Sequence, residues 1–99
     1  MKVTLLYFEG CPHWRRMDAV LELLAEEIPG LEIGRQTITT PEEAEATGFR
    51  GSPSVLIDGV DAFFDESAPV GLTCRVYQTP AGPSGSPTLE QLRERLTRR

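Results

Sequence analysis

Apolar residues are dense at the start of the chain, where their spacing changes from that of a strand to that of a helix. Residues 2–8 are almost continuously apolar, which is typical of a strand covered by helices on both faces. Residues 9–12 (Glu-Gly-Cys-Pro) interrupt this run, and Pro12 suits a first helical turn because that position needs no N–H donor. Apolar residues then recur every three or four positions, which predicts an amphipathic helix from Pro12 to Ile28.

The next stretch predicts a second strand followed by a short helix. Residues 31–39 alternate imperfectly between apolar and polar side chains and predict the strand. Residues 40–48 predict the helix, because Thr40 and Glu43 have the spacing of a capping box and Pro41 stands in the first turn.

The last third predicts two short strands and a closing helix. Residues 54–57 form an apolar strand that the pair Asp58-Gly59 closes with a turn. A loop of about a dozen residues separates this strand from a last one over residues 72–77. Residues 78–87 are rich in Pro, Gly and Ser and predict a second loop. The closing helix begins at Thr88 and has leucines along one face.

The predicted order is strand, helix, strand, helix, strand, strand, helix (βαβαββα), which places the chain in the α/β class. A right-handed crossover through the first helix makes the first two strands parallel. The strands over residues 54–57 and 72–77 are joined without a helix, so we expect them to pair antiparallel. Neither a repeat nor a linker divides the 99 residues, which predicts one domain over residues 1–99.

Composition narrows the classes of partner. Fifteen acidic against ten basic residues give a net charge of −5, which argues against nucleic acid or an anionic membrane as the main partner. Neither a long apolar run nor a small-residue cleavage site is found near the start, so we expect a cytoplasmic protein. The acidic loop after residue 57 lacks the ligand ladder of a calcium loop, and we expect solvated surface charge there and no metal site.

Two motifs resemble the thioredoxin/glutaredoxin superfamily. Residues 7–14 (Tyr-Phe-Glu-Gly-Cys-Pro-His-Trp) are similar to its active-site turn, in which the first cysteine lies between the first strand and the first helix. Residues 49–59 (Phe-Arg-Gly-Ser-Pro-Ser-Val-Leu-Ile-Asp-Gly) are similar to the segment in which a cis-proline opens the third strand. The resemblance covers essentially the whole chain. It implies a three-layer sandwich in which helices cover both faces of a four-stranded mixed sheet.

The resemblance also implies roles for individual residues. Pro53 would be cis and would face the reactive sulfur, and the backbone of Ser52 would be an edge on which an extended substrate docks. The second cysteine of the superfamily's Cys-x-x-Cys turn is absent, because Trp14 stands in its place. A dithiol cycle within the turn is therefore excluded. A one-cysteine mechanism remains, or a resolving cysteine elsewhere, for which Cys74 is the only candidate.

Cys11 and its neighbours are the candidates for chemistry. A helix N-terminus stabilises a thiolate through its free N–H groups, which predicts a nucleophilic Cys11, although the alternative is a small side chain that fills the strand-to-helix corner. His13 is a candidate for tuning Cys11 or moving its proton, or it merely sets the local field. Pro12 and Trp14 are candidate substrate contacts, although for Trp14 the favoured alternative is a place in the core.

Cys74 and Arg75 are candidates from the last predicted strand. Antiparallel pairing with residues 54–57 would carry Cys74 back toward Pro53, where it could resolve a mixed disulfide if the Cα atoms came within about 7 Å. The alternative is a buried strand cysteine. Arg75 could pair with an anionic substrate such as a glutathione carboxylate, or it could be a solvated charge at the strand edge.

Two functions follow from these candidates. In the first, a thiol–disulfide oxidoreductase, Cys11 attacks a disulfide or accepts a glutathionyl group, and Cys74 or an external thiol resolves the product. Its partners would be a protein disulfide or a low-molecular-weight thiol, with no cofactor beyond glutathione as a co-substrate. In the second, a non-redox binding protein, Cys11 and Cys74 hold a soft ion such as Hg(II) or Cu(I), or the same scaffold docks a protein partner.

Overall fold

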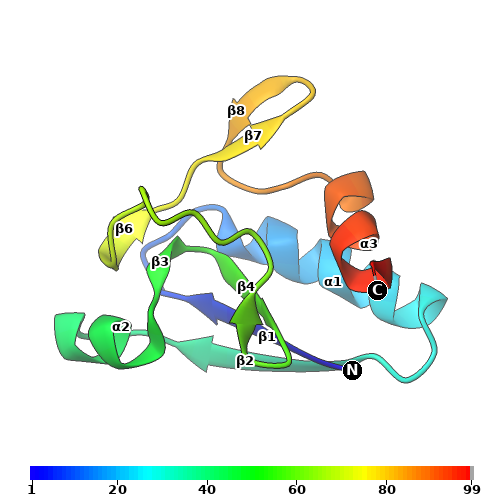
Figure 1. The fold of residues 1–99 in the computed structure, drawn as a ribbon, viewed down its shortest axis with the longest axis horizontal. Coiled ribbons are helices and arrows are strands. Elements are labelled where there is room, and N and C mark those ends of the chain that lie inside the picture. The colour runs from blue at the N-terminus through cyan, green and yellow to red at the C-terminus, as the bar shows by residue number, and fades with distance from the viewer. Residues whose placement is uncertain (99) are drawn as a thin grey trace.

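A four-stranded mixed sheet and three helices form the framework of the chain in the part that the structure describes, residues 1–98 of a computed structural model (Figure 1). In chain order the elements are β1 (Lys2–Tyr7), α1 (Trp14–Glu27), β2 (Glu32–Thr37), α2 (Pro41–Thr47), β3 (Arg50–Ser52), β4 (Ser54–Ile57), β5 (Val60–Asp61), β6 (Gly71–Cys74), β7 (Tyr77–Thr79), β8 (Gly82–Ser84) and α3 (Leu89–Thr97).

The main sheet has the order β2-β1-β4-β5. β1 and β2 are parallel, with α1 as the crossover between them, as the sequence predicts. β4 runs antiparallel to β1, and the short β5 runs antiparallel to β4. β1 is therefore a central strand, and the chain that leaves its carboxyl end continues directly into the turn that carries Cys11.

β1 is buried on both faces, as its apolar run predicts. On one face Val3, Leu5 and Tyr7 pack against α1 and α3, where the buried partners are Met17, Leu21, Leu24, Leu92 and Leu96. On the other face Leu6 packs against Ile38, Phe49 and Ala44, and Ala44 belongs to α2. Helical residues thus cover both faces of β1, and burial of these side chains, at about 25 cal/mol per Å² of apolar surface, is the main stabilising contribution.

The ends of the helices follow their capping residues. Thr40 and Glu43 form the predicted capping box of α2, and Thr88 forms a second one with Gln91 at the start of α3. α1 begins at Trp14, two residues later than predicted from Pro12. The reason is local: the first helical hydrogen bond reaches only from the Met17 N–H to the carbonyl of His13, at 3.4 Å, so the preceding residues remain a turn.

The predicted pairing of the last two strands is wrong. Asp58 and Gly59 both have positive φ, 49° and 87°, and they turn the chain tightly so that β5 pairs back onto β4. An Asp-Gly pair in this conformation is the usual two-residue hairpin turn. The hairpin occupies the edge of β4 that residues 72–77 would have needed. β6 instead pairs parallel with β3, Arg50 lying opposite Gly71 and Ser52 opposite Cys74.

The predicted strand over residues 72–77 is also divided, and the predicted loop over 78–87 contains a hairpin. β6 ends at Cys74, the chain turns at Arg75, and Tyr77 begins the antiparallel pair β7–β8. Residues 71–76, which we call the strap, lie alongside β3, and the β7–β8 hairpin projects from the body of the molecule beyond them (Figure 1). Within residues 1–98, none of the helices has the length and apolar character that a membrane crossing requires.

Candidate functional site

The structure brings the two predicted motifs together. Cys11 lies in the turn between β1 and α1, and its Sγ is 3.5 Å from the carbonyl oxygen of Ser52, in donor geometry for a thiol hydrogen bond. The Ser52–Pro53 peptide bond is cis, as predicted. The Phe8 N–H donates to the hydroxyl oxygen of Ser52 at 3.3 Å, which ties the end of β1 to the same residue. Cys11 and the Ser52–Pro53 peptide, 41 positions apart in the chain, form one site.

Cys11 is nearly enclosed, with 4% of its surface exposed. Its N–H donates to the carbonyl of Phe8 at 3.1 Å, which holds the turn close to the end of β1. The first turn of α1 has neither an acidic residue nor a side-chain cap, so protein carboxylates do not neutralise the positive end of the helix near Cys11. Cys11 is thus buried in the strand-to-helix corner, as the alternative to a nucleophile predicts, and its sulfur also contacts Ser52; its role as a nucleophile stays a prediction.

The strap covers the backbone edge on which a substrate was expected to dock. The Arg75 N–H donates to the Ser52 carbonyl at 3.0 Å, and the Gly71 N–H donates to the Phe49 carbonyl at 3.0 Å. The Ser52 carbonyl thus accepts from both the strap and the Cys11 thiol. The strap thus occupies the Ser52 edge in this structure, and docking of a substrate there stays a prediction.

Gly51 is the reason that the strap can approach so closely. Its φ is +108°, and a Cβ on this residue would lie 3.0 Å from the Cβ and 3.2 Å from the backbone N and Cα of Arg75. A side chain at position 51 would therefore separate β3 from the strap, whereas glycine allows both the conformation and the contact.

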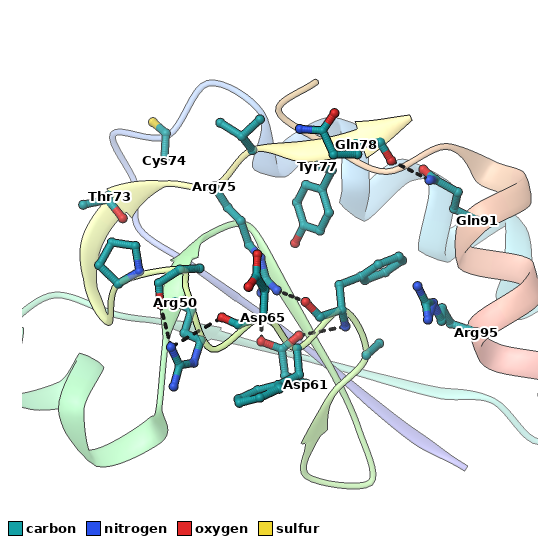
Figure 2. A pocket seen from close by; sticks show the side chains of 16 residues that line it. Arg50, Asp61, Asp65, Thr73, Cys74, Arg75, Tyr77, Gln78, Gln91 and Arg95 are labelled. Atoms are coloured by element: carbon teal, nitrogen blue, oxygen red, sulfur yellow. Dashed lines mark hydrogen bonds and ion pairs between the residues drawn. The ribbon is translucent and has the colours of Figure 1, made fainter. Parts of the chain in front are cut away.

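Cys74 is exposed and lies directly across the β3–β6 pair from Ser52. The alternative of a buried strand cysteine is therefore wrong. Cys11 and Cys74 are both free thiols. In Figure 2 the sulfur of Cys74 points away from the cluster around Arg75 and Asp61, toward the outer side of the strap. The backbone of Cys74 thus lies beside Ser52 through parallel pairing with β3, whereas the sequence led us to expect antiparallel pairing with β4.

Arg75 is a buried structural residue, which neither prediction for it anticipated. Its side chain is 4% exposed and pairs with Asp61, whose side chain is 10% exposed, at 2.8 Å. The same guanidinium donates to the hydroxyl of Ser54 at 3.0 Å and to the carbonyl of Phe63. Its donors are directed at protein acceptors, so the guanidinium is neither solvated nor open to a substrate carboxylate. It fastens the strap to the loop that follows β5.

Tyr77 supports the site through the backbone of Pro53. Its hydroxyl donates to the Pro53 carbonyl, and its ring packs edge-on against Phe63 with centroids 5.3 Å apart. Burial raises the pKa of Tyr77 above its ordinary value, so the phenol stays protonated as a donor. The sequence marked Tyr77 only as a strand residue, and no local signal shows that its hydroxyl reaches the backbone of Pro53.

Of the other residues of the turn, Trp14 packs inward and Pro12 and His13 face outward. Trp14 stacks on Tyr7, with centroids 4.1 Å apart, and packs against the larger core cluster, which favours its core role. Pro12 and His13 are exposed. The ring of His13 lies against Gly85, and a Cβ placed on Gly85 would be only 2.3 Å from a ring carbon of His13. His13 and Cys74 both line a hollow of about 270 Å³. Among the hydrogen bonds of residues 1–98, none joins His13 to Cys11.

A second, larger cleft of about 690 Å³ lies between the loop after β5, the strap, β7 and α3 (Figure 2). The polar side chains that line it include Arg50, Asp61, Asp65, Arg75, Gln91 and Arg95. Three arginines against two aspartates make this lining more basic than the chain as a whole. No local pattern in the sequence indicates the cleft, because its lining residues come from four separate segments and its arginines are scattered along the chain.

Among the residues described, 1–98, no three or more His, Cys, Asp and Glu side chains come close enough together to hold a metal ion. Comparison with protein-family models, with curated proteins and with solved structures finds no significant match to this chain.

Proposed function

We propose that this protein is a thiol–disulfide oxidoreductase on a thioredoxin-like scaffold, with Cys11 as its nucleophile. The observation that carries the proposal is the position of the Cys11 Sγ, 3.5 Å from the carbonyl of Ser52 and next to the cis Ser52–Pro53 peptide. A sulfur so placed, ahead of an uncapped helix, is oriented toward the peptide along which an extended disulfide would lie.

The arrangement of the main sheet supports the thioredoxin-like scaffold. β1 lies between a parallel and an antiparallel neighbour, and the proline segment leads straight into that antiparallel neighbour, β4. α1 and α3 pack on one face of β1, and a residue of α2 packs on the other. This is the layer order that the resemblance implies.

The proposed reaction is a two-step thiol–disulfide exchange. In the first step the Cys11 thiolate attacks one sulfur of a protein or low-molecular-weight disulfide. A new S–S bond joins Cys11 to that sulfur, and the other sulfur leaves as a thiolate that takes up a proton. In the second step the Cys74 thiolate, or the thiolate of glutathione, attacks the mixed disulfide and releases the bound half as a thiol. Attack by Cys74 leaves a Cys11–Cys74 disulfide, and an external dithiol or two glutathione molecules then reduce it. Attack by glutathione leaves glutathione joined to Cys11, and a second glutathione frees the Cys11 thiol and forms glutathione disulfide.

The exposure of Cys74 suits the second role, since a resolving thiol must reach the mixed disulfide from the solvent side. Its place opposite Ser52 keeps it next to the peptide that the Cys11 sulfur contacts. We place the reaction in the cytoplasm, where the glutathione pool supplies the reducing thiol.

The test is mass spectrometry under non-reducing conditions after incubation with glutathione disulfide, together with turnover of a glutathione mixed disulfide. We expect the wild-type protein to form a Cys11–Cys74 disulfide, Cys74→Ser to retain glutathione on Cys11, and Cys11→Ser to lose turnover. Full turnover by Cys11→Ser would contradict the proposal. Stoichiometric binding of Hg(II) or Cu(I) by both cysteines, without any turnover, would favour the binding protein instead.

A further inference from the structure

We infer that the strap is a gate over Cys11 and that the ion pair between Arg75 and Asp61 holds it closed. The inference rests on the proposed function, since it concerns access to the same sulfur. It assigns to Arg75 the role of a positioning residue, which acts on Cys11 only through the strap.

The strap occupies the place of a substrate. An extended polypeptide that added to β3 would need the Ser52 carbonyl as an acceptor, and the Arg75 N–H already donates to this oxygen at 3.0 Å. In this position Cys11 is only 4% exposed. A disulfide in a polypeptide can therefore reach the sulfur only after the strap has left the edge of β3.

The strap is attached mainly at its ends. Leu72, Thr73 and Cys74 are all exposed, and so is Val76, so the strap has almost no apolar anchor in the core. Its fastenings to the rest of the chain include the short parallel pairing of β6 with β3, the backbone bonds of Gly71 and Arg75, and the side chain of Arg75. Segments with few buried apolar contacts open locally at a much smaller free-energy cost than global unfolding.

The Arg75–Asp61 pair is the charged fastening of the strap. Arg75 is buried, Asp61 is largely enclosed, and their charged atoms are 2.8 Å apart, so removal of one partner leaves a poorly compensated charge away from solvent. Asp61 belongs to β5 and lies outside the Cys11 and Ser52 contacts. Asp61→Asn therefore weakens the gate and leaves the atoms of the proposed reaction in place.

Opening of the strap would expose the edge of β3, and this edge suits one class of partner. That partner is an extended polypeptide with a disulfide, which takes the place of β6 along β3 by backbone hydrogen bonding. Cys74 would move away with the strap when the substrate enters. It would attack the mixed disulfide only after the substrate backbone, still joined to Cys11, has left β3 and the strap has returned. Gating thus separates the two steps in time.

The experiment measures the rate at which iodoacetamide alkylates Cys11 in the folded protein, with each cysteine followed by peptide mass spectrometry. We expect Asp61→Asn to raise the Cys11 rate at least about tenfold over wild type, because the loss of one partner of a buried pair favours opening. Cys74 is already exposed, and its rate should change by less than about twofold.

Asp18→Asn is the matched control, because Asp18 also pairs with an arginine, Arg35, at 2.6 Å but lies on α1 away from the strap. It should leave the Cys11 rate unchanged. Hydrogen exchange separates gating from unfolding: in Asp61→Asn the Arg75 amide should lose protection while the amides of β1 keep theirs.

An unchanged Cys11 rate in Asp61→Asn would overturn the inference. Simultaneous loss of protection in β1 would also overturn it, since exposure would then come from global unfolding. Neither readout depends on turnover. A chain with a gate but without disulfide turnover would refute only the proposed function, and turnover without a change in alkylation would refute only the gate.

Discussion

Replacement of Gly51 by alanine tests the close approach of the strap to β3. At φ +108° any residue with a Cβ is strained, and a Cβ here would also lie 3.0–3.2 Å from the backbone and Cβ of Arg75. These atoms belong to a residue whose side chain is itself fixed by Asp61, so they have little freedom to move away. Gly51→Ala therefore combines backbone strain with a steric conflict.

The magnitude follows from these two contributions. A residue held in an unfavourable φ/ψ region costs about 1–3 kcal/mol, and an extra carbon in a tightly packed contact costs about 1–3 kcal/mol more. The expected loss is about 2–6 kcal/mol, a large part of the 5–15 kcal/mol that stabilises a typical domain. Gly82 is the control, because its φ is +109° but nothing lies within 4 Å of a Cβ there. Gly82→Ala should cost only the strain, about 1–3 kcal/mol.

The assay is urea unfolding followed by circular dichroism, with the free energy of unfolding taken from the linear dependence on urea. The difference between Gly51→Ala and Gly82→Ala isolates the steric contribution. We expect Gly51→Ala to be the less stable variant by about 1–3 kcal/mol. Equal losses in the two variants would show that the contact between Gly51 and Arg75 contributes nothing to stability.

Two further predictions concern the core and the support of Pro53. Leu21→Ala, in the fully buried face of α1, should reduce the free energy of unfolding by about 2–5 kcal/mol. Leu23 lies on the same helix with 55% of its surface exposed, and Leu23→Ala should change the free energy of unfolding by less than about 0.5 kcal/mol. Equal effects of the two substitutions in urea titrations would contradict the assigned core. Because burial raises the pKa of Tyr77 above the ordinary value of 10.0, its contribution to stability is complete below pH 10 and is lost as the pH rises further, since the unfolded chain ionises first. Tyr77→Phe should therefore lose less stability than wild type between neutral and strongly alkaline pH, and parallel pH profiles of the urea midpoint would refute this.

The parts of the fold that the sequence predicted are those with strong local signals. The continuous apolar run of β1, the helical spacing that reaches Leu24 in α1 and the capping box of Thr40 and Glu43 each identify an element within a short window. The resemblance of two motifs to the thioredoxin/glutaredoxin superfamily implied that the proline segment would face Cys11. In the structure β4 runs antiparallel to β1 with Ser54 opposite Leu6, so the start of β4 lies beside the end of β1 and Ser52 contacts Cys11.

The parts that the sequence did not predict depend on competition between distant segments. The turn at Asp58 and Gly59 pairs β5 with the edge of β4. That edge is therefore not available to β6, which pairs with β3 instead. The burial of Arg75 depends on Asp61, 14 positions away, and an arginine beside an apolar strand carries no mark of such a partner. The covering of Ser52 follows from these two events, so no inspection of the proline motif alone could reveal it.

The exposed side chains of the strap have a consequence for how this chain can diversify. Backbone hydrogen bonds and one arginine hold the segment, so residues 72–73 can change identity with little effect on the core. Sequence drift at these positions would alter the outward face beside Cys74 while the framework stayed intact. The same tolerance makes this stretch a suitable place to insert a short recognition peptide by design.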